Sequence, residues 1–250
     1  MRIRTILIYR TGETHPEIVR DVGNYMDWFA RVVGDRAALM PHDAVTEPVP
    51  PRAALDGIDG MVVTGSPLSL VEPEAWMEDA AAFVDEAAGR GVPILGICFG
   101  HQLVGHAFGG RVRKNPRGWE AGTHEVALTE DGRRDPLFRG VPERVRVIQS
   151  HRDEVADLGP TTVRLAGGAH SENQAIGVGC HVRGVQFHPE MNGSIIRRVI
   201  EHRRALLTDD AHATGRGPTA AAEALLAGAT DTPDAEQVMR NFVDHFVAKA

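Results

Sequence analysis

Apolar runs alternate with segments of helical character over residues 1–205. Three short runs are apolar at nearly every position and are bounded by turn residues, which is typical of strands buried on both faces: residues 3–9, 60–64 and 93–97. The segments between them carry apolar residues at helical spacing (17–33) or are rich in alanine (74–88). Buried strands that alternate with helices predict a mostly parallel sheet covered on both faces.

The middle of the chain changes to shorter strand candidates separated by turns, and these need not all be parallel. They are residues 125–129, 145–149, 162–165, 174–178 and 181–187. Residues 194–207 return to helical spacing. We therefore expect a single α/β domain in which a mixed, mainly parallel central sheet is flanked by helices.

The last fifth of the chain differs in composition from the rest. Residues 208–234 are rich in Ala, Gly, Thr and Asp, which favours a flexible insertion with one short helix around residues 220–226. A final helix begins near Asp234, a residue suited to the N-cap. Its apolar residues follow at i, i+4 and i+8: Val238, Phe242 and Phe246. The chain is thus divided into a main domain (1–207), a flexible insertion (208–234) and a C-terminal helix that packs on the domain (235–250).

The composition is that of an ordinary globular protein, with 250 residues, of which 42% are hydrophobic and 24% charged. The net charge of −7 does not suggest a nucleic-acid-binding surface. No apolar run approaches the roughly 20 residues that span a bilayer, and the N-terminus lacks the features of a signal peptide. Two cysteines, Cys98 and Cys180, give no disulfide framework. We expect a cytoplasmic location without membrane or nucleic-acid partners.

Cys98 lies in the segment Gly96-Ile97-Cys98-Phe99-Gly100, directly after a strand candidate and before residues of helical spacing. Strand, tight turn and helix, with glycines two before and two after the cysteine, form the cysteine counterpart of the Gly-x-Ser-x-Gly nucleophile elbow. A sharp turn strains the backbone at the nucleophile, and the glycines make room for it. The helix N-terminus favours the thiolate, and its N–H groups can stabilise an oxyanion. Cys98 is therefore the candidate nucleophile.

A candidate base and acid follow a later strand, in the segment Phe187-His188-Pro189-Glu190. His188 and Glu190 are separated by a proline that stiffens the turn. A carboxylate in this position can orient the imidazole and fix its tautomer. We therefore predict a Cys98-His188-Glu190 triad, whose members meet in the fold despite their separation in the sequence.

The motifs GICFGHQ (96–102) and GVQFHPE (184–190) resemble the signatures of the class I glutamine amidotransferases. The resemblance spans roughly residues 1–205 in motif order. Three further segments match, at residues 63–67, 118–120 and 149–155, and the last two resemble the stand-alone branch related to the glutaminase domain of GMP synthase. The resemblance implies that residues 1–207 adopt the flavodoxin-like class I amidotransferase fold.

The same resemblance implies hydrolysis of the side-chain amide of glutamine, giving glutamate and ammonia for a separate acceptor synthase. Cys98 would attack the amide carbon to form a γ-glutamyl thioester, and His188 would carry the thiol proton to the departing ammonia. The oxyanion hole is implied at the backbone N–H groups of Phe99, Gly65 and Ser66. The substrate's amino-acid end is implied to contact Gln102, Ser150, His151, Arg152 and Asp153.

Two residues depart from the family pattern and leave the substrate open. Ser66 stands where many relatives have glycine, and Arg152 replaces a small residue. A γ-glutamyl peptidase or hydrolase that uses the same triad on γ-glutamyl conjugates is therefore one alternative. A catalytically silent regulatory or binding protein is an alternative of another class, against which the intact triad argues.

The other cysteine and histidines are assigned no chemistry. Cys180 has no motif around it and is expected to be structural. His101 and His106 lie on the helix after Cys98, where packed or hydrogen-bonded histidines are common. No metal-ligand spacing stands out among the twelve histidines, and the chain has no phosphate-binding loop motif. We expect no metal and no cofactor.

Overall fold

The apolar runs of the sequence form the strands at the centre of the molecule. The structure, a computed structural model, describes residues 3–217 and 221–247. Its strands are β1 (Thr5–Arg10), β2 (Ala38–Asp43), β3 (Gly60–Val63), β4 (Ile94–Ile97), β5 (Arg111–Lys114), β6 (Glu120–Leu128), β7 (Arg144–His151), β8 (Asp153–Asp157), β9 (Thr162–Gly167), β10 (Ala175–Val178) and β11 (Val182–Val185).

Helices connect most of these strands. The α-helices are α1 (Pro16–Val22), α2 (Tyr25–Val33), α3 (Ala75–Gly89), α4 (Phe99–Ala107), α5 (Glu130–Arg134), α6 (Gly193–His202), α7 (Arg204–Ala213), α8 (Ala222–Gly228) and α9 (Pro233–His245). Short 3-10 helices are η1 (Gly34–Arg36), η2 (Arg52–Gly57) and η3 (Pro136–Phe138). Within the described residues, no helix is both long enough and apolar enough to cross a membrane.

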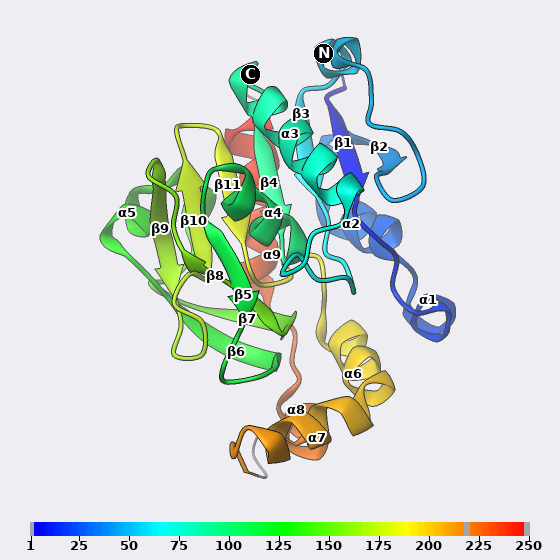
Figure 1. Cartoon of the computed structure of the whole chain (residues 1–250), viewed down its shortest axis with the longest axis vertical. Coiled ribbons are helices and arrows are strands. Elements are labelled where there is room, and N and C mark those ends of the chain that lie inside the picture. The colour runs from blue at the N-terminus through cyan, green and yellow to red at the C-terminus, as the bar shows by residue number, and fades with distance from the viewer. Residues whose placement is uncertain (1–2, 218–220, 248–250) are drawn as a thin grey trace.

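One large sheet organises the fold, with the strand order β2-β1-β3-β4-β11-β10-β9-β6-β7 (Figure 1). The half from β2 to β11 is parallel, and the strands from β11 to β7 pair antiparallel. β5 and β8 form a separate antiparallel pair. The predicted single α/β domain, with a mixed central sheet and flanking helices, is confirmed.

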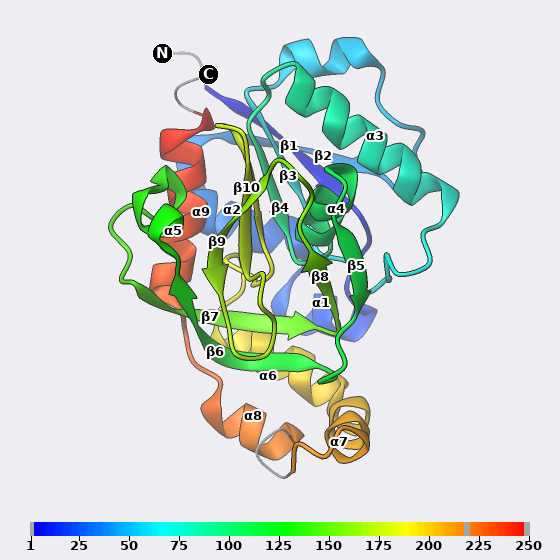
Figure 2. The same ribbon diagram turned by 60° about the vertical axis from the view of Figure 1, so that its left-hand side comes forward.

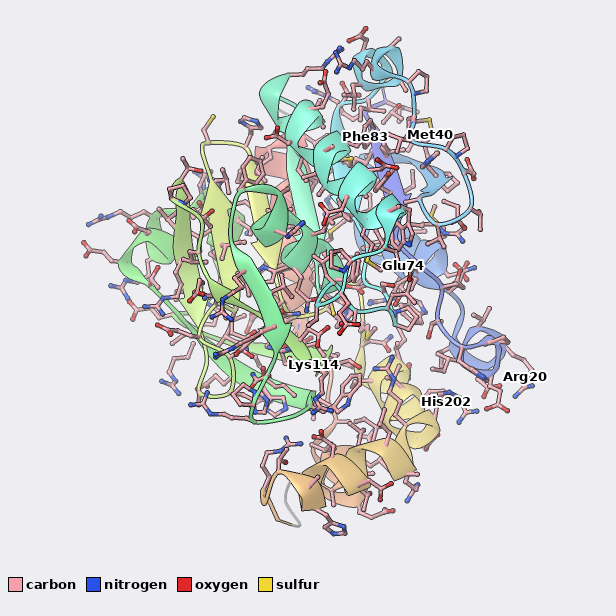
Figure 3. The ribbon with its side chains drawn as sticks, viewed as in Figure 1. Arg20, Met40, Glu74, Phe83, Lys114 and His202 are labelled. Carbon is pink, nitrogen blue, oxygen red and sulfur yellow. The ribbon has the colours of Figure 1, made fainter. Side chains whose placement is uncertain are left out.

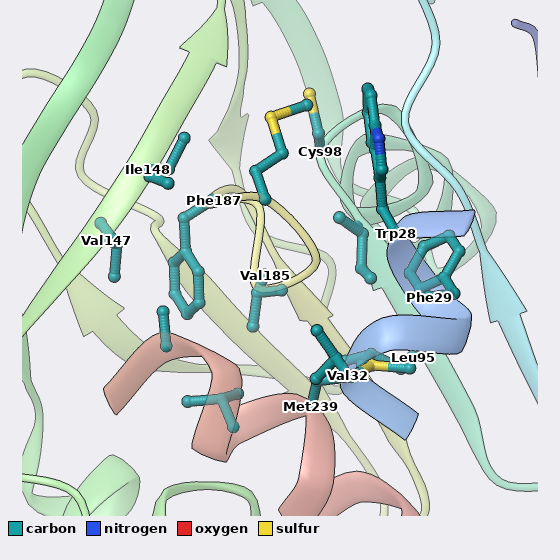
Figure 4. Close-up of a cluster of buried hydrophobic side chains, with 14 of the residues drawn as sticks. Trp28, Phe29, Val32, Leu95, Cys98, Val147, Ile148, Val185, Phe187 and Met239 are labelled. Carbon is teal, nitrogen blue, oxygen red and sulfur yellow. The ribbon is translucent and has the colours of Figure 1, made fainter. Parts of the chain in front are cut away.

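Helices cover both faces of the sheet (Figure 2). They bury its branched side chains. On one face, α2, α6 and α9 contribute to one buried cluster. Figure 4 shows part of it, including Phe29, Phe187 and Met239. On the other face, α3 and α4 pack on the parallel strands, with Met77 and Phe83 buried between them. Burying each such side chain contributes roughly 1.5–3 kcal/mol, so the parallel strands are held rigidly from both sides.

The segment 17–33, expected as one helical stretch, forms two helices. α1 ends at Gly23, which has φ 79°. The Asn24 side chain then accepts hydrogen bonds from the N–H groups of Met26 and Asp27, while the Asp27 carboxylate accepts the N–H of Asn24. This capping box starts α2 in a new direction, and the spacing of apolar residues alone does not contain that signal.

Two other local features differ from the sequence pattern. β2 was not anticipated because half of its residues are exposed and none is fully buried at the sheet edge, where Pro41 is tolerated. The prediction of Asp234 as N-cap is wrong, because Thr232 occupies that position and Pro233 begins α9.

The segment expected to be a flexible insertion, 208–234, contains the end of α7 and all of α8 in its described part. The two helices lie together at one end of the molecule (Figure 1). Leu207 and Ala211 of α7 are buried, and the carboxylate of Asp210 accepts the backbone N–H of Trp119 at 2.8 Å. α7 is therefore attached to the loop that precedes β6.

Candidate active site

Three neighbouring parallel strands end at the same edge of the sheet and bring the candidate residues there. β3 leads into the Gly65-Ser66 turn, β4 into Cys98 and β11 into His188. Because β4 lies between β3 and β11, the loops after these strands face one another across Cys98. Strand order thus brings together residues that are far apart in the sequence.

The backbone at Cys98 is sharply turned, with φ 53° and ψ −102°, and no other non-glycine residue in the described part of the chain has positive φ. A Cβ on Gly96 would stand 2.3 Å from the carbonyl oxygen of Gly100, and a Cβ on Gly100 would stand 2.2 Å from that of Val63. The N–H of Cys98 donates to the carbonyl of Val185 at 2.9 Å. This is the backbone of a nucleophile elbow, and only glycine fits at the two flanking positions.

The His188 imidazole and the Glu190 carboxylate form a buried pair, with Nδ1 and Oε1 2.7 Å apart. The backbone N–H of His188 donates to the carbonyl of Ile148 at 2.9 Å, and Arg31 donates to the carbonyl of Glu190 at 3.0 Å. Nε2 of His188 has no oxygen or nitrogen partner among the described residues. The imidazole is therefore oriented by Glu190 and keeps one nitrogen available for Cys98.

Cys98 and His188 face each other across Gly65. A Cβ on Gly65 would stand 3.1 Å from Cε1 of His188 and 3.6 Å from Cβ of Cys98. Burial alone would lower the pKa of His188, but the charges of Glu190 and Cys98, and hydrogen bonding to both, outweigh burial and raise that pKa well above its ordinary value. At neutral pH the imidazole is therefore protonated, as a thiolate–imidazolium pair requires.

The two segments predicted to form the oxyanion hole, at Phe99 and at Gly65-Ser66, both lie next to Cys98. α4 begins at Phe99, so the first N–H groups of the helix have no acceptor within it. Gly65 lies against Cys98 and His188 on the other side. The hydroxyl of Ser66 accepts the N–H of Leu68 at 3.1 Å, so it is engaged within its own loop. The backbone N–H groups of Phe99, Gly65 and Ser66 therefore stay the predicted donors to an oxyanion beside Cys98.

A cavity of about 270 Å³ opens over Cys98 and Phe99. This volume is near the lower end of small-molecule sites, roughly 300–1,000 Å³, and suits an amino acid or a small conjugate of one. Every residue predicted to contact substrate lines it: Gln102, Ser150, His151, Arg152 and Asp153. A narrow recess of about 20 Å³ beside it is lined by Cys98, His188 and Ser66.

Several of these side chains bind protein groups around the cavity. The imidazole of His151 contacts Glu120 through Nε2 at 3.0 Å, and Arg152 pairs with Asp210 at 3.1 Å. Although burial alone would raise the pKa of Glu120, its hydrogen bond with His151 lowers it, so the carboxylate is ionised. The amide of Gln102 donates to the carbonyl of Asp153 at 2.8 Å. These contacts fix the walls of the cavity.

The residues around Cys98 that the sequence motifs missed include Tyr25, Lys114, Arg203 and Leu206. Tyr25 and Arg203 lie on or beside helices whose apolar stripes predict packing and nothing more. Lys114 lies at the end of β5 (Figure 3). Its only sequence signal was compositional, since the chain has a single other lysine, Lys249.

One group of side chains in residues 3–217 and 221–247 has ligand atoms close enough for a metal ion: His15, Glu17 and His202, within 4.8 Å of one another. The two imidazoles are stacked at 4.0 Å with an interplanar angle of 29°, so their in-plane lone pairs do not converge on one point. Arg198 also approaches the Glu17 carboxylate at 3.9 Å. This exposed group is therefore better described as a surface contact between α1 and α6.

The remaining cysteine and two histidines lie apart from this chemistry. Cys180 is exposed next to Gly179 in the turn between β10 and β11, so it is not a packed core residue. Burial lowers the pKa of His101 to about 3, which keeps that imidazole neutral. His106 contacts Glu78 at 3.1 Å. The two histidines are packed or hydrogen-bonded, as expected.

The sequence profile of the family described as Glutamine amidotransferase class-I matches residues 21–203. The chain belongs to the class I glutamine amidotransferase family. One subunit of the glutamine-hydrolyzing GMP synthase of Methanopyrus kandleri is 33% identical to it over 74% of this chain and 89% of that protein. Gamma-glutamyl peptidase 5 of Arabidopsis thaliana is 29% identical over 59% of each chain, so the match spans less than two thirds of that relative.

A solved structure of a glutamine amidotransferase from Thermotoga maritima has the same fold, with a TM-score of 0.72, 24% identity and 99% of both chains covered. The part of this chain that matches the class I glutamine amidotransferase profile includes Cys98, His188 and Glu190 and ends at Arg203. α7 and α8 follow that part, yet Leu206 of α7 lines the cavity. Family membership confirms the resemblance carried by the two motifs and leaves the substrate to be determined.

Glu190→Gln should lower the pH at which His188 loses its proton. Burial lowers the pKa of His188, and the Glu190 charge is the largest contribution that raises it, so loss of that charge should lower the pKa. An NMR titration of the imidazole should show His188 losing its proton at a lower pH in the variant than in the native protein. Glu201→Gln, on an exposed part of α6, is the control; equal titration of His188 in both variants would contradict this electrostatic account.

Proposed function

We propose that the protein hydrolyses the side-chain amide of glutamine to glutamate and ammonia through a thioester on Cys98. The observation that carries this proposal is the elbow at Cys98, with φ 53°, facing the buried His188-Glu190 pair. A buried thiol on a strained turn, next to an imidazole of raised pKa, is the arrangement expected of a nucleophile and not of a packing residue.

The chemistry follows from the atoms that face one another. The sulfur of Cys98 attacks the δ-carbon of glutamine, and backbone N–H groups of Phe99 and of the Gly65-Ser66 turn receive the oxyanion. His188 gives its proton to the leaving nitrogen, so that the C–N bond breaks and ammonia departs. The same imidazole then takes a proton from water, whose oxygen attacks the thioester carbon and releases glutamate and the thiolate.

The ammonia is proposed to serve a separate synthase. This proposal is supported by the similarity to the Methanopyrus kandleri protein, which by its name is one component of a larger GMP synthase and which this chain matches over 89% of its length. The acceptor enzyme is therefore expected to bind near the mouth of the cavity, where ammonia would emerge.

Cys98→Ala should reduce glutamine hydrolysis by at least about 10³-fold, because the nucleophile is lost while the cavity remains. Cys180→Ala, which removes the exposed cysteine, should leave kcat/KM unchanged. The measurement is release of ammonia and glutamate from glutamine by purified protein. Retention of hydrolysis in Cys98→Ala would falsify the thioester mechanism, and it would also favour a different role for the fold.

A second candidate, hydrolysis of γ-glutamyl peptides by the same residues, is favoured by the mouth of the cavity. Leu68 and Leu206 are large hydrophobic residues that line it and remain 39% and 46% exposed. The exposed Lys114 lines it too, and within the described residues no carboxylate lies at ion-pair distance from its ammonium. The apolar surfaces of Leu68 and Leu206, next to the ammonium of Lys114, suit a leaving group that is larger than ammonia and carries a carboxylate.

Lys114→Ala distinguishes the two substrate classes. If γ-glutamyl peptides are substrates, the change should raise KM for γ-glutamylglycine about fivefold, since an exposed charge contributes little, and should leave KM for glutamine unchanged. Arg111→Ala, at the start of the same strand and outside the cavity, is the matched control. Equal kinetics of Lys114→Ala and native protein on the peptide would remove this candidate's electrostatic support.

A further inference from the structure

The guanidinium of Arg203 lies in the lining of the cavity over Cys98 and has no carboxylate partner among the described residues. It lines both the main cavity and the recess beside Cys98. Among residues 3–217 and 221–247, no carboxylate lies within ion-pair distance of it, whereas its neighbours Arg198 and Arg204 on the same helical segment both form such pairs. The side chains of Cys98 and Tyr25 are the acidic groups that act on Arg203, and no carboxylate offsets the cost of withdrawing this cation from solvent. Its position therefore favours a carboxylate that enters the cavity.

The donors of Arg203 are mostly unused by the protein. A guanidinium has five N–H groups, and the one hydrogen bond recorded for Arg203 within the described residues runs from Nη1 to the hydroxyl of Ser150 at 2.8 Å. Burial lowers the pKa of Arg203, although arginine remains charged at any physiological pH. The remaining N–H groups are available to a planar acceptor in the cavity, and a carboxylate matches their geometry.

The guanidinium is also held in place. Its carbon lies 5.0 Å from the centroid of the Trp119 ring, in the stacked arrangement of a cation–π contact. The backbone N–H of Trp119 donates to the carboxylate of Asp210 in α7. That buried carboxylate also pairs with Arg152 and Arg216. The loop and helix around Arg203 are therefore fixed, and an oriented guanidinium loses little entropy when it binds an anion.

We propose that Arg203 binds the α-carboxylate of the γ-glutamyl group and so selects substrates that carry it. This inference rests on the proposed function. In a γ-glutamyl substrate, three carbons separate the α-carboxylate from the carbonyl carbon that Cys98 attacks. Arg203 and Cys98 share the lining of the same recess, so one ligand can reach both. The role requires no bond to change at Arg203; it positions the substrate.

The test compares Arg203→Met with native protein on two amides, L-glutamine and 4-aminobutanamide, which is glutamine without the α-carboxylate. The expected result is an increase of about 100-fold in KM for glutamine, with kcat changed less, and at most a threefold change in kcat/KM for 4-aminobutanamide. Arg203→Lys should recover part of the loss on glutamine. Arg204→Met, which removes the adjacent exposed arginine, should behave as native protein on both amides.

A binding measurement covers the case in which 4-aminobutanamide turns over too slowly to follow. In Cys98→Ala, calorimetry should show L-glutamine binding more tightly than 4-aminobutanamide, and adding Arg203→Met should abolish that difference. Equal losses of affinity for both ligands would mean that Arg203 supports folding or stabilises the thiolate of Cys98. No loss of affinity would mean that it has no role in binding. Either result overturns the proposal. Hydrolysis that survives in Cys98→Ala would refute the catalytic mechanism while the carboxylate preference could still be measured.

Discussion

The left-handed backbone at Cys98 is the constraint on which the site depends. Such a conformation costs of order 1–3 kcal/mol for a residue with a side chain, and the packed sheet maintains it from both sides. Gly96 and Gly100 approach neighbouring backbone too closely for any Cβ, and the Cys98 N–H is fixed to the strand that leads to His188. The same contacts that strain the cysteine therefore set its distance to the base. Because β3, β4 and β11 are adjacent and parallel, one edge of the sheet collects Cys98, His188 and the Gly65-Ser66 turn, which we propose as nucleophile, base and backbone donors.

Charge is the second organising element of the site. Glu190 is buried against His188, and its charge, together with Cys98 and hydrogen bonding to both, outweighs burial and raises the pKa of His188. The guanidinium of Arg203 lines the same recess as Cys98 and His188 and adds a positive charge there. A second charged residue, Asp210 of α7, holds the cavity wall together. Its carboxylate pairs with Arg152 and accepts the backbone N–H of Trp119. α7 lies beyond the part of the chain that matches the family profile, so this protein's cavity is completed by a segment outside that matched part.

The sequence predicted the fold well where a single physical signal dominated. The buried strands appear as unbroken apolar runs, and the Gly96–Gly100 motif specifies its own turn because only glycine tolerates the backbone contacts. The break between α1 and α2 depends on a capping box, and β2 on an edge position, so hydrophobic spacing could not reveal either. The sequence could not identify Arg203 and Lys114 as candidate binding residues. Their proposed roles depend on the absence of a nearby carboxylate, which only the three-dimensional structure reveals. For the same reason, the sequence could not show that the side chains of His151 and Arg152, predicted to contact substrate, bind Glu120 and Asp210.

The most direct test of the central claim, that Cys98 is the nucleophile toward a γ-glutamyl carbonyl, is covalent labelling with a diazo-ketone analogue of glutamine. Peptide mass spectrometry of the labelled protein should find one adduct per chain, on Cys98, and excess L-glutamine should slow its formation. Cys180 is exposed and serves as an internal control for non-specific alkylation. Labelling of Cys180 in preference to Cys98, or labelling of Cys98 that glutamine does not slow, would contradict the account.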